Sequence, residues 1–355
     1  MLYPATDETI ARAAALLASG HLVGIPTETV YGLAANAWDA AAVHKIFAAK
    51  SRPPSNPLIV HVASVERLAD AIQWPPSETI QRQLNAISDL WPGPLTVVCP
   101  KSDRVPDVVT AGKPTVAVRI PAHDVALALL EACNFPLAAP SANQSKYISP
   151  TKAEHLFGQC GIAQSLSMVL DGGQCRWGVE STIVKLGEAV PRLLRPGAVS
   201  LTELATRFGV TPEAMLMTEG LTHAESHRDT DGIAAEPESF LAPGMMREYY
   251  CPTTPLVLLD AHDLNREPSR AINDAARVAR IAFKPLPPEI ISTYAAVETL
   301  SSTGDLREVA HHLFAAMRRL DSEGFDLIQC DTCEPIGMGH AIMDRLHRAA
   351  ARTQG

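Results

Sequence analysis

Hydrophobic residues recur along the first 200 residues with two periods, one typical of helices and one typical of strands. The helical period, an apolar position every three or four residues, occurs at residues 7–19, 39–50, 64–72, 77–90 and 123–133. Short apolar runs that predict buried strands lie at 21–25, 57–62, 95–99, 115–120, 167–171, 181–186 and 191–195. The two kinds of element mix without strict βαβ alternation. We therefore expect an α+β or α/β domain with a twisted mixed sheet.

The pattern changes at residues 213–250, which are polar, acidic and without a period, as in a linker. Beyond them, strand-like runs at 255–260, 278–283 and 325–330 are interleaved with helical patterns, which lie at 268–277, 305–322 and 340–352. This alternation predicts a smaller C-terminal α/β domain, Rossmann-like, with a parallel sheet. The predicted organisation is a first domain at 3–200, a linker at 201–252 and a second domain at 253–355.

Composition narrows the class of protein. Of the 355 residues, 46% are hydrophobic, which is too many for a disordered chain. No apolar run approaches the roughly 18 residues of a membrane helix, so we expect no membrane partner. The N-terminus has no basic region ahead of an apolar stretch, so no targeting signal is expected. The seven cysteines show no disulfide framework, which suits a reducing compartment. These features together predict a cytoplasmic protein.

Charge is distributed unevenly between the two parts of the chain. Residues 1–200 hold 16 Lys and Arg against 16 Asp and Glu, which leaves 14 against 23 in residues 201–355 and a net charge of −9. Binding along a nucleic acid depends on neutralising phosphates, so this balance argues against such a surface. A small anion needs only a few well-placed cations, and the acidic second part need not touch it.

Signals for a metal site or a phosphate-binding loop are weak. Cys330 and Cys333 form a lone CxxC without the second pair that zinc would need, and Pro335 and Gly337 follow at once. A strand end beside a turn is therefore expected here, rather than zinc binding or redox chemistry. No P-loop is present, and the GxG at 337–339 is a weak sign of dinucleotide binding.

The segment 50–62 carries the clearest candidate chemistry. Lys50 and Arg52 flank a predicted helix end, and prolines stiffen the turn before a strand. Two cations on a stiff turn can coordinate several phosphate oxygens. The alternative is that both cap the helix and are solvated. His61 alternates with Val60 and Val62, so it points away from their face. A buried histidine with satisfied hydrogen bonds is the alternative to a ligand-binding one.

Two further segments follow strands and are rich in small polar residues. Residues 26–33, PTETVYGL, combine hydroxyls with a glycine that permits close approach of a ligand, although Glu28 could instead start a helix. Residues 140–143, PSAN, precede Ser149 and Thr151, at a predicted helix N-terminus that could bind an anion. Each segment alone is only a turn signal.

Taken together, these motifs resemble the threonylcarbamoyl-AMP synthase family with its YrdC-like domain. The resemblance rests on PTETVYGL at 26–33, KSRPPSNPLIVHV at 50–62, WPGPLT at 91–96, AVRIP at 117–121, APSAN at 139–143, GVESTIV at 178–184 and LRPG at 194–197. These occur in the family's order over roughly residues 5–200. Residues 242–252, APGMMREYYCP, and the region after them resemble the linker and C-terminal domain of the family's long form.

The resemblance implies an enzyme, a nucleotidyltransferase that makes threonylcarbamoyl-AMP and pyrophosphate from L-threonine, bicarbonate or CO2, and ATP. It implies Lys50 and Arg52 as catalytic cations that neutralise the triphosphate. The implied ATP-binding residues are Arg52, Asn56, Thr115, Ser141, Asn143, Ser149, Arg195 and Tyr250. The implied threonine-binding residues are Thr29, His61, Arg119 and Ser181, with Arg119 on the substrate carboxylate.

The family resemblance also bears on cofactors and partners. Mg²⁺ is expected to arrive with ATP, bound largely through phosphates and water, with no metal held tightly by the protein. The product feeds the proteins that transfer the threonylcarbamoyl group to tRNA, while direct tRNA binding is expected to be weak or absent. The rival interpretations are a carbamoyl-transfer module of hydrogenase maturation, which would carry zinc-finger cysteines upstream, and a non-catalytic RNA-binding module, which the charge count disfavours.

The linker departs from the family pattern at two positions. The usual histidine before the linker tyrosine, Tyr250, is Tyr249 here, and the preceding basic residue is Glu248. These departures leave the contacts of the linker with the nucleotide open. We expect the stretch 213–242 to act as a lid that closes on ATP and threonine.

Overall fold

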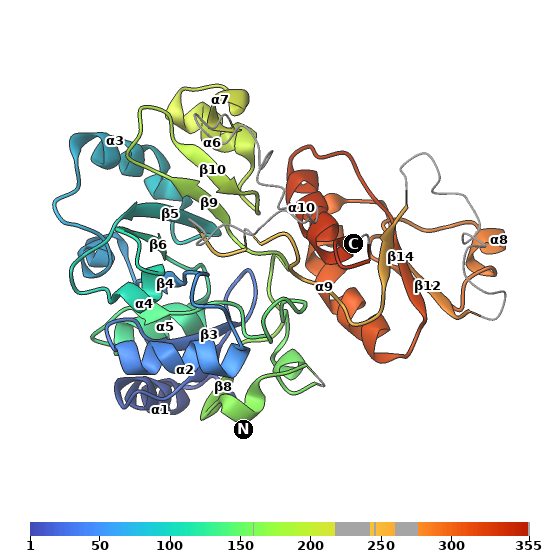
Figure 1. Cartoon of the computed structure of the whole chain (residues 1–355), viewed down its shortest axis with the longest axis horizontal. Coiled ribbons are helices and arrows are strands. Elements are labelled where there is room, and N and C mark those ends of the chain that lie inside the picture. Colours follow the sequence, from blue (N-terminus) through green and yellow to red (C-terminus); the bar gives the residue numbers. More distant parts are fainter. Residues whose placement is uncertain (159, 217–241, 245, 260–275, 354–355) are drawn as a thin grey trace, which may run out of the picture.

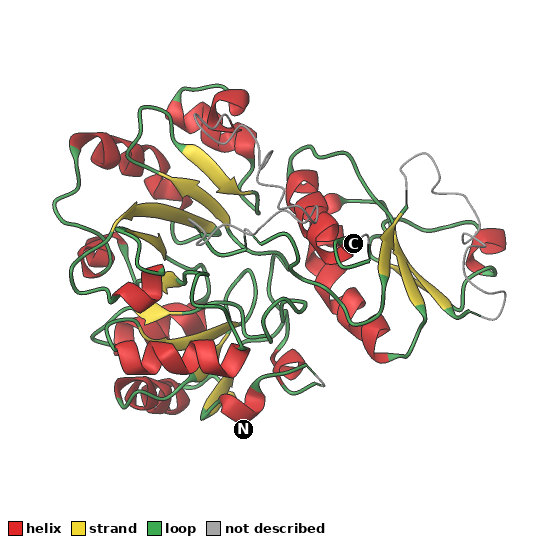
Figure 2. Ribbon diagram, in the orientation of Figure 1, coloured by secondary structure: helices red, strands yellow, loops and turns green. Residues whose placement is uncertain are grey.

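In the computed structural model, two separate sheets organise the chain, one of ten strands and one of four (Figure 1). The structure describes residues 1–158, 160–216, 242–244, 246–259 and 276–353. The larger body holds the ten-stranded sheet and the smaller body the four-stranded one, with helices on both (Figure 2). This arrangement confirms the predicted pair of a mixed-sheet domain and a smaller α/β domain.

The large sheet is mixed, with parallel and antiparallel neighbours in the order β1-β8-β2-β3-β7-β4-β6-β5-β9-β10. Its strands are β1 (Leu2–Pro4), β2 (Val23–Ile25), β3 (Gly32–Asn36), β4 (Ile59–His61), β5 (Leu95–Pro100), β6 (Thr115–Arg119), β7 (Leu137–Ala138), β8 (Met168–Asp171), β9 (Thr182–Lys185) and β10 (Arg192–Arg195). Every predicted strand of the first 200 residues is present. The pattern missed β1 and also β3, where small residues give no alternation of large apolar and polar side chains.

Several helices of the large body begin at side chains that cap them. Thr6 forms a capping box with Thr9, and Asp39 accepts hydrogen bonds from two backbone amides of the following helix. The helices are α1 (Asp7–Ala18), α2 (Ala40–Lys50), α3 (Glu78–Ile87), α4 (Asp107–Thr110), α5 (Asp124–Ala132), α6 (Leu201–Phe208) and α7 (Pro212–Leu216), with short 3₁₀ turns η1 (Val65–Asp70), η2 (Ser88–Leu90), η3 (Ala153–Leu156) and η4 (Ala163–Ser165). The predicted helix at 64–72 is thus a 3₁₀ turn.

Alternation along the central strands separates two faces of the large sheet. Val60, Val97, Val118 and Val184 point into the main core beneath α2 and α3. Their neighbours in sequence, Ile59, Val98, Ala117 and Ile183, form a small apolar cluster on the opposite face, together with Ala242 of the predicted linker. The sheet therefore has one face for packing and one that can carry a site.

The small sheet is entirely parallel in its described strands, in the order β11-β14-β12-β13. Its strands are β11 (Leu256–Leu258), β12 (Val278–Ala282), β13 (Ala296–Thr299) and β14 (Leu327–Cys330), and its helices α8 (Pro288–Ile291), α9 (Leu306–Ser322) and α10 (Met338–Ala350). The three predicted strands and two of the predicted helices are present. The third predicted helix, at 268–277, falls almost wholly outside the described residues.

Part of the predicted linker belongs physically to the large body. Helices α6 and α7 contribute Leu204, Ala205 and Met215 to its main core. Most of the stretch predicted to be a lid, 213–242, lies outside the described residues, and the predicted domain limits stay a prediction. No helix in the described part of the chain is long and apolar enough to cross a membrane.

Helices α9 and α10 of the small body face the large body (Figure 1). Arg318 of α9 donates to the carbonyls of Ile148 and Ser149, and Tyr147 donates to Asp321 at 2.7 Å. Gly178 of the large body, at φ +71°, touches the backbone of α9 so closely that a Cβ there would overlap the carbonyl oxygens of Ala310 and His311. The two bodies thus meet through backbone as well as side chains.

We predict that Gly178→Ala destabilises the protein more than Gly112→Ala. Gly112 has the same positive φ but open space around it, so alanine there costs about 1–2 kcal/mol for the left-handed backbone. Gly178→Ala adds the overlap with α9, a further ~1–3 kcal/mol. Urea unfolding of the two variants measures this difference, and equal losses would contradict the close docking of α9 on residue 178.

Candidate functional site

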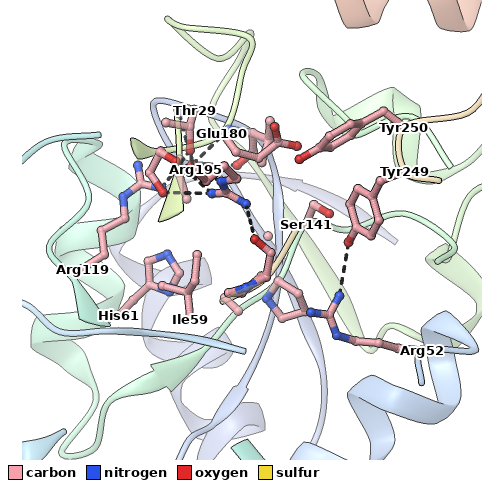
Figure 3. A pocket seen from close by; sticks show the side chains of 17 residues that line it. Thr29, Arg52, Ile59, His61, Arg119, Ser141, Glu180, Arg195, Tyr249 and Tyr250 are labelled. Carbon is pink, nitrogen blue, oxygen red and sulfur yellow. Dashed lines mark hydrogen bonds between the residues drawn. The ribbon is translucent and has the colours of Figure 1, made fainter. Parts of the chain in front are cut away.

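A pocket lies on the second face of the large sheet, where loops from positions as distant as residues 27–32 and 243–250 converge (Figure 3). Its cavity volume is about 40 Å³, and it is lined by Thr27, Thr29, Val30, Gly32, Arg52, Ile59, His61, Arg119, Ala139, Pro140, Ser141, Glu180, Ser181, Arg195, Pro243, Tyr249 and Tyr250. Eight of the residues predicted from the sequence are in this lining. They come from segments that are far apart in the chain and are united only by the fold.

One end of the pocket is organised by Arg119, the last residue of β6. Its guanidinium forms an ion pair with Glu28 and donates to the hydroxyl of Thr29 at 2.9 Å, and both carboxylate and guanidinium are buried. Residues 26–30 form a loop between β2 and β3, so Glu28 does not start a helix. A buried cation and a buried carboxylate fix each other's orientation. Glu28 does not line the pocket itself but orients Arg119, a function that its position in the sequence did not indicate.

His61 lies beside Arg119, because the two residues are paired across β4 and β6. Its neighbours Val60 and Val62 point into the core, as the alternation predicts, while the imidazole lines the pocket. The side chain is 3% exposed, and its Nδ1 has no hydrogen-bond partner among the described residues. Burial, and then the charge of Arg119, lower the pKa of His61 to about 3. The imidazole is therefore neutral at physiological pH.

The opposite end of the pocket is formed by Arg52 and the linker. Arg52 donates through Nε to the carbonyl of Asn56 at 2.9 Å, through Nη2 to the Asn56 side chain and the Pro57 carbonyl at 2.6 Å, and through Nη1 to the Tyr249 hydroxyl at 3.2 Å. The guanidinium is thus held on the turn that the sequence predicted to be stiff. Tyr249, where the family has histidine, contacts this cation directly, while Glu248 lies 3.6 Å from Lys146.

Lys50 lies behind the pocket wall rather than in its lining. It ends α2, is 0% exposed, and donates to the carbonyls of Ser141 and Asn143, both at 2.5 Å. Burial, followed by the charges of Arg52 and Arg318, lowers its pKa well below the usual value. It is therefore not a solvated helix cap. Its contacts fix the 141–143 loop, whose Ser141 faces the pocket.

Arg195 and Ser181 form a third part of the wall. Arg195 donates to the carbonyl of Ser181 at 3.0 Å, to its hydroxyl at 3.2 Å, and to the Pro243 carbonyl at 3.1 Å. The Ser181 hydroxyl also lies 2.8 Å from that of Thr96. Arg195 is the last residue of β10 and Ser181 immediately precedes β9, so adjacent strands place the two residues together. These contacts also hold the described end of the linker, at Pro243, over the pocket.

The other predicted residues do not line the pocket. All of them lie close to it except Thr115. Ser149 donates to the carboxylate of Glu180 at 2.5 Å, and Glu180 lines the pocket. Asn56 and Asn143 are buried beside Arg52 and Lys50 respectively. Thr115 lies at the other end of β6 from Arg119, on the same face of the strand. Glu180 belongs to the motif at 178–184, but no residue spacing in the sequence indicated that it would line a pocket.

Buried polar atoms of four predicted residues lack a hydrogen-bond partner within the described part of the chain. They are His61 Nδ1, Asn143 Oδ1, the Tyr250 hydroxyl and Arg119 Nη2, which nevertheless forms the ion pair with Glu28. Such atoms are rare in folded proteins because each costs free energy. Their occurrence in and beside one pocket indicates that a polar ligand supplies the missing partners. Burial, followed by the nearby Glu180, raises the pKa of Tyr250, so its hydroxyl stays protonated and can donate.

The described residues include no group of three His, Cys, Asp or Glu side chains that could hold a metal ion. Cys330 ends β14 and Cys333 lies in the turn after it, both as free thiols, which agrees with the expected strand end beside a turn. The cations that the protein itself places at the pocket are Arg52, Arg119 and Arg195 in the lining and Lys50 behind it.

Two family models together match most of the chain. The Sua5/YciO/YrdC model, described as telomere recombination, matches residues 15–197. The model described as the C-terminal domain of threonylcarbamoyl-AMP synthase matches residues 206–351. The first matched range contains every strand of the large sheet except β1, and the second contains the small sheet.

Individual proteins match over nearly the full length. A threonylcarbamoyl-AMP synthase of Pyrococcus abyssi is 38% identical over 95% of this chain and 93% of its own, and one of Bacillus subtilis is 37% identical over 97% and 93%. The crystal structure of P. abyssi Sua5 complexed with L-threonine superposes with a TM-score of 0.81, at 35% identity, over 99% of this chain and 97% of that one. The similarity thus extends through both bodies and the linker.

We predict that His61 makes the protein acid-sensitive. Its pKa is about 3 in the folded protein and 6.5 ordinarily, so the unfolded chain binds the proton more readily. The stability contributed by neutral His61 is complete above pH 6.5 and is lost as the pH falls towards 3. The loss between pH 7 and 5 is about 2 kcal/mol, since one pKa unit is worth about 1.4 kcal/mol. Urea unfolding at both pH values should show a smaller drop for His61→Gln; equal drops would contradict the prediction.

Proposed function

The chain belongs to the threonylcarbamoyl-AMP synthase family, and we propose that the pocket between Arg119 and Arg52 is where it binds L-threonine and ATP. The enzyme makes threonylcarbamoyl-AMP and pyrophosphate from L-threonine, bicarbonate or CO2, and ATP. The observation that carries the site assignment is the convergence of polar side chains from seven separate motifs on one pocket. Neither a single motif nor its spacing would bring them together.

The reaction sets an electrostatic requirement that this pocket meets. The threonine amine becomes a carbamate, whose oxygen attacks the α-phosphate of ATP, so two anions have to approach each other. Such a step requires fixed cations on both anions and a site from which water is largely kept out. Arg52, Arg119 and Arg195 are all at most 4% exposed and are held by hydrogen bonds before substrate arrives. Catalysis in this site consists mainly of positioning and charge stabilisation.

L-Threonine occupies the Arg119 end of the pocket in this proposal. Arg119 binds the substrate carboxylate while its ion pair with Glu28 fixes the orientation of the guanidinium. Thr29 and Ser181 provide hydroxyls at this end, and the neutral imidazole of His61 offers Nδ1. Val30 and Ile59 are apolar residues of the lining that can contact a methyl group. The end of the pocket therefore has partners for every group of threonine.

ATP lies along the same face of the sheet, from the middle of the pocket towards Thr115. Thr115 and Arg119 are four positions apart on the strand, a length of about 13 Å, which suits a nucleotide extended along β6. Arg52 and Lys50 act on the triphosphate, Arg52 directly and Lys50 through its charge behind the 141–143 loop. An anion bound here favours the protonated form of Lys50. The other residues on the ATP side are Asn56, Ser141, Asn143, Ser149 and Arg195.

The described end of the linker covers the nucleotide in this proposal. Pro243, Tyr249 and Tyr250 line the pocket, and Arg52 and Arg195 already hold them by hydrogen bonds to Tyr249 and Pro243. The Tyr250 ring is 0% exposed and its hydroxyl is available for a ligand. We propose that residues 201–252 serve as linker and lid, the function expected from the sequence.

Mg²⁺ reaches the site with ATP in this proposal, held mainly by phosphate oxygens and water. The product is passed to the proteins that modify tRNA, in the cytoplasm. Direct tRNA binding is weak, which a salt titration of tRNA binding can measure, because tight binding to phosphates would weaken steeply with salt. The experiment that tests the function is pyrophosphate release from ATP, measured with threonine and bicarbonate together and with each omitted. Release that does not depend on both would refute the proposal.

We predict that Arg52→Ala and Lys50→Ala each reduce pyrophosphate release by about 10²–10³-fold, because each removes charge stabilisation from the reacting phosphate. The matched control is Arg67→Ala, which removes a half-exposed arginine whose partner is Asp70 on the surface. The control should retain normal activity. Normal activity in the Arg52 or Lys50 variant would show that the triphosphate binds elsewhere.

We predict that Arg119→Ala raises the KM for threonine about 10- to 100-fold, with a smaller change in the KM for ATP, since a charge-assisted hydrogen bond to a carboxylate is worth about 1.5–3 kcal/mol. Serine in place of threonine should lower kcat/KM of the unmodified enzyme by about 10- to 200-fold, the value of one methyl group in an apolar contact. A change confined to the KM for ATP would reverse the proposed orientation of the two substrates.

A further inference from the structure

Arg345 of α10 reaches from the small body into the wall of the pocket. The side chain is 0% exposed, although it belongs to a different body from the pocket. Its Nε donates to the Glu180 carboxylate at 3.0 Å, its Nη2 to the Glu180 carbonyl at 3.4 Å and its Nη1 to the Pro196 carbonyl at 2.7 Å. Asp344, next in the chain, lies 2.9 Å from the same guanidinium. All three nitrogens are therefore used.

These contacts are made to residues directly next in sequence to residues proposed to bind substrate. Glu180 lines the pocket and precedes Ser181, while Pro196 follows Arg195. The guanidinium also lies over the ring of Tyr250, 5.5 Å from its centre. Figure 3 shows Glu180, Arg195 and Tyr250 grouped on one side of the pocket. A single side chain of α10 thus contacts three separate parts of the wall.

The negative charge of Glu180 gives its contact with Arg345 an electrostatic role in addition to packing. Its carboxylate accepts from Ser149 through Oε1 and from Arg345 through Oε2. Arg195, on the same wall, donates to Ser181 and Pro243 instead. Arg345 is thus the cation that forms an ion pair with Glu180 in the described structure. Without it, a buried carboxylate would stand unneutralised beside the proposed path of ATP, and like charges would repel at low dielectric.

We propose that Arg345 is a positioning residue for the ATP site: it neutralises Glu180 and fixes the 180–181 and 195–196 segments, so that the small body completes the pocket of the large one. The proposal rests on the assignment of Ser149 and Arg195 to ATP in the proposed function. It gives the C-terminal domain a defined part in the reaction, because that domain supplies a charge that the pocket needs although it contacts no substrate itself.

The test is a charge cycle on the full chain, with KM and kcat measured by pyrophosphate release. Arg345→Met should raise the KM for ATP by about 10- to 100-fold, because it leaves Glu180 unpaired. The KM for threonine should change less. Glu180→Gln in the Arg345→Met background removes the stranded charge and should restore the KM for ATP to within a few-fold of the unmodified enzyme. A role limited to holding the two bodies together gives no such rescue.

The matched control is Tyr147→Phe, which removes the hydrogen bond to Asp321 between the two bodies and changes a residue outside the pocket lining. It should leave the KM for ATP unchanged. An unchanged KM in Arg345→Met, or an Arg345→Met defect that Glu180→Gln does not relieve, overturns the proposal. If Arg345→Met does not fold, the test uses the double variant Arg345→Met with Glu180→Gln. A KM for ATP near that of the unmodified enzyme then supports the proposal, and a strongly raised KM overturns it. Threonine-independent release by the unmodified enzyme would instead refute the proposed function.

Discussion

The site depends on cations that are buried before any substrate binds. Lys50, Arg52, Arg119 and Arg195 are the only four of the 16 Lys and Arg residues in positions 1–200 that are buried in the described structure, and all four lie at the pocket. Burying a charge is costly unless hydrogen bonds or opposite charges compensate it. Here the compensation comes mainly from backbone carbonyls, which hold the cations in place and neutralise them only partly. The remaining positive potential is what two anionic substrates require.

Two carboxylates at the pocket reduce the positive charge that its cations supply. Glu28 pairs with Arg119, and Glu180 pairs with Arg345. Each carboxylate orients a guanidinium but also removes positive charge from the site. A pocket whose cations had neither carboxylate nor carbonyl partners would bind anions strongly yet would not fix their positions, because arginine side chains without any partner keep their rotamer freedom. Preorganisation therefore costs some electrostatic attraction, and the arrangement keeps Arg52 and Arg195, which have no carboxylate partner among the described residues, free of that loss.

The strands and most of the helices could be predicted because their apolar periods reflect direct packing against the core. The positions of Val60 and Val62 in the core, with His61 on the other face, followed from alternation alone. Elements built from small residues, such as β3, gave no such signal. The candidate residues came from motifs, and the structure brings most of them together. The partners of those residues could not be predicted: Lys50 on the 141–143 carbonyls, Glu28 on Arg119 and Tyr249 on Arg52 are contacts between distant segments, which no local pattern encodes.

The charge distribution also shows what the sequence alone could not predict about the site. The second part of the chain carries the entire net negative charge, which suggested that it need not approach a phosphate. Net charge describes the surface, however, and a site is determined by a few buried groups. Arg318 and Arg345 are buried residues of the acidic part, and both lie against the loops that form the pocket wall. Those two side chains contact the large body, whereas the acidic residues of α9 and α10 are not in the pocket lining. The small body can therefore be acidic overall and still supply positive charge near the proposed reaction site.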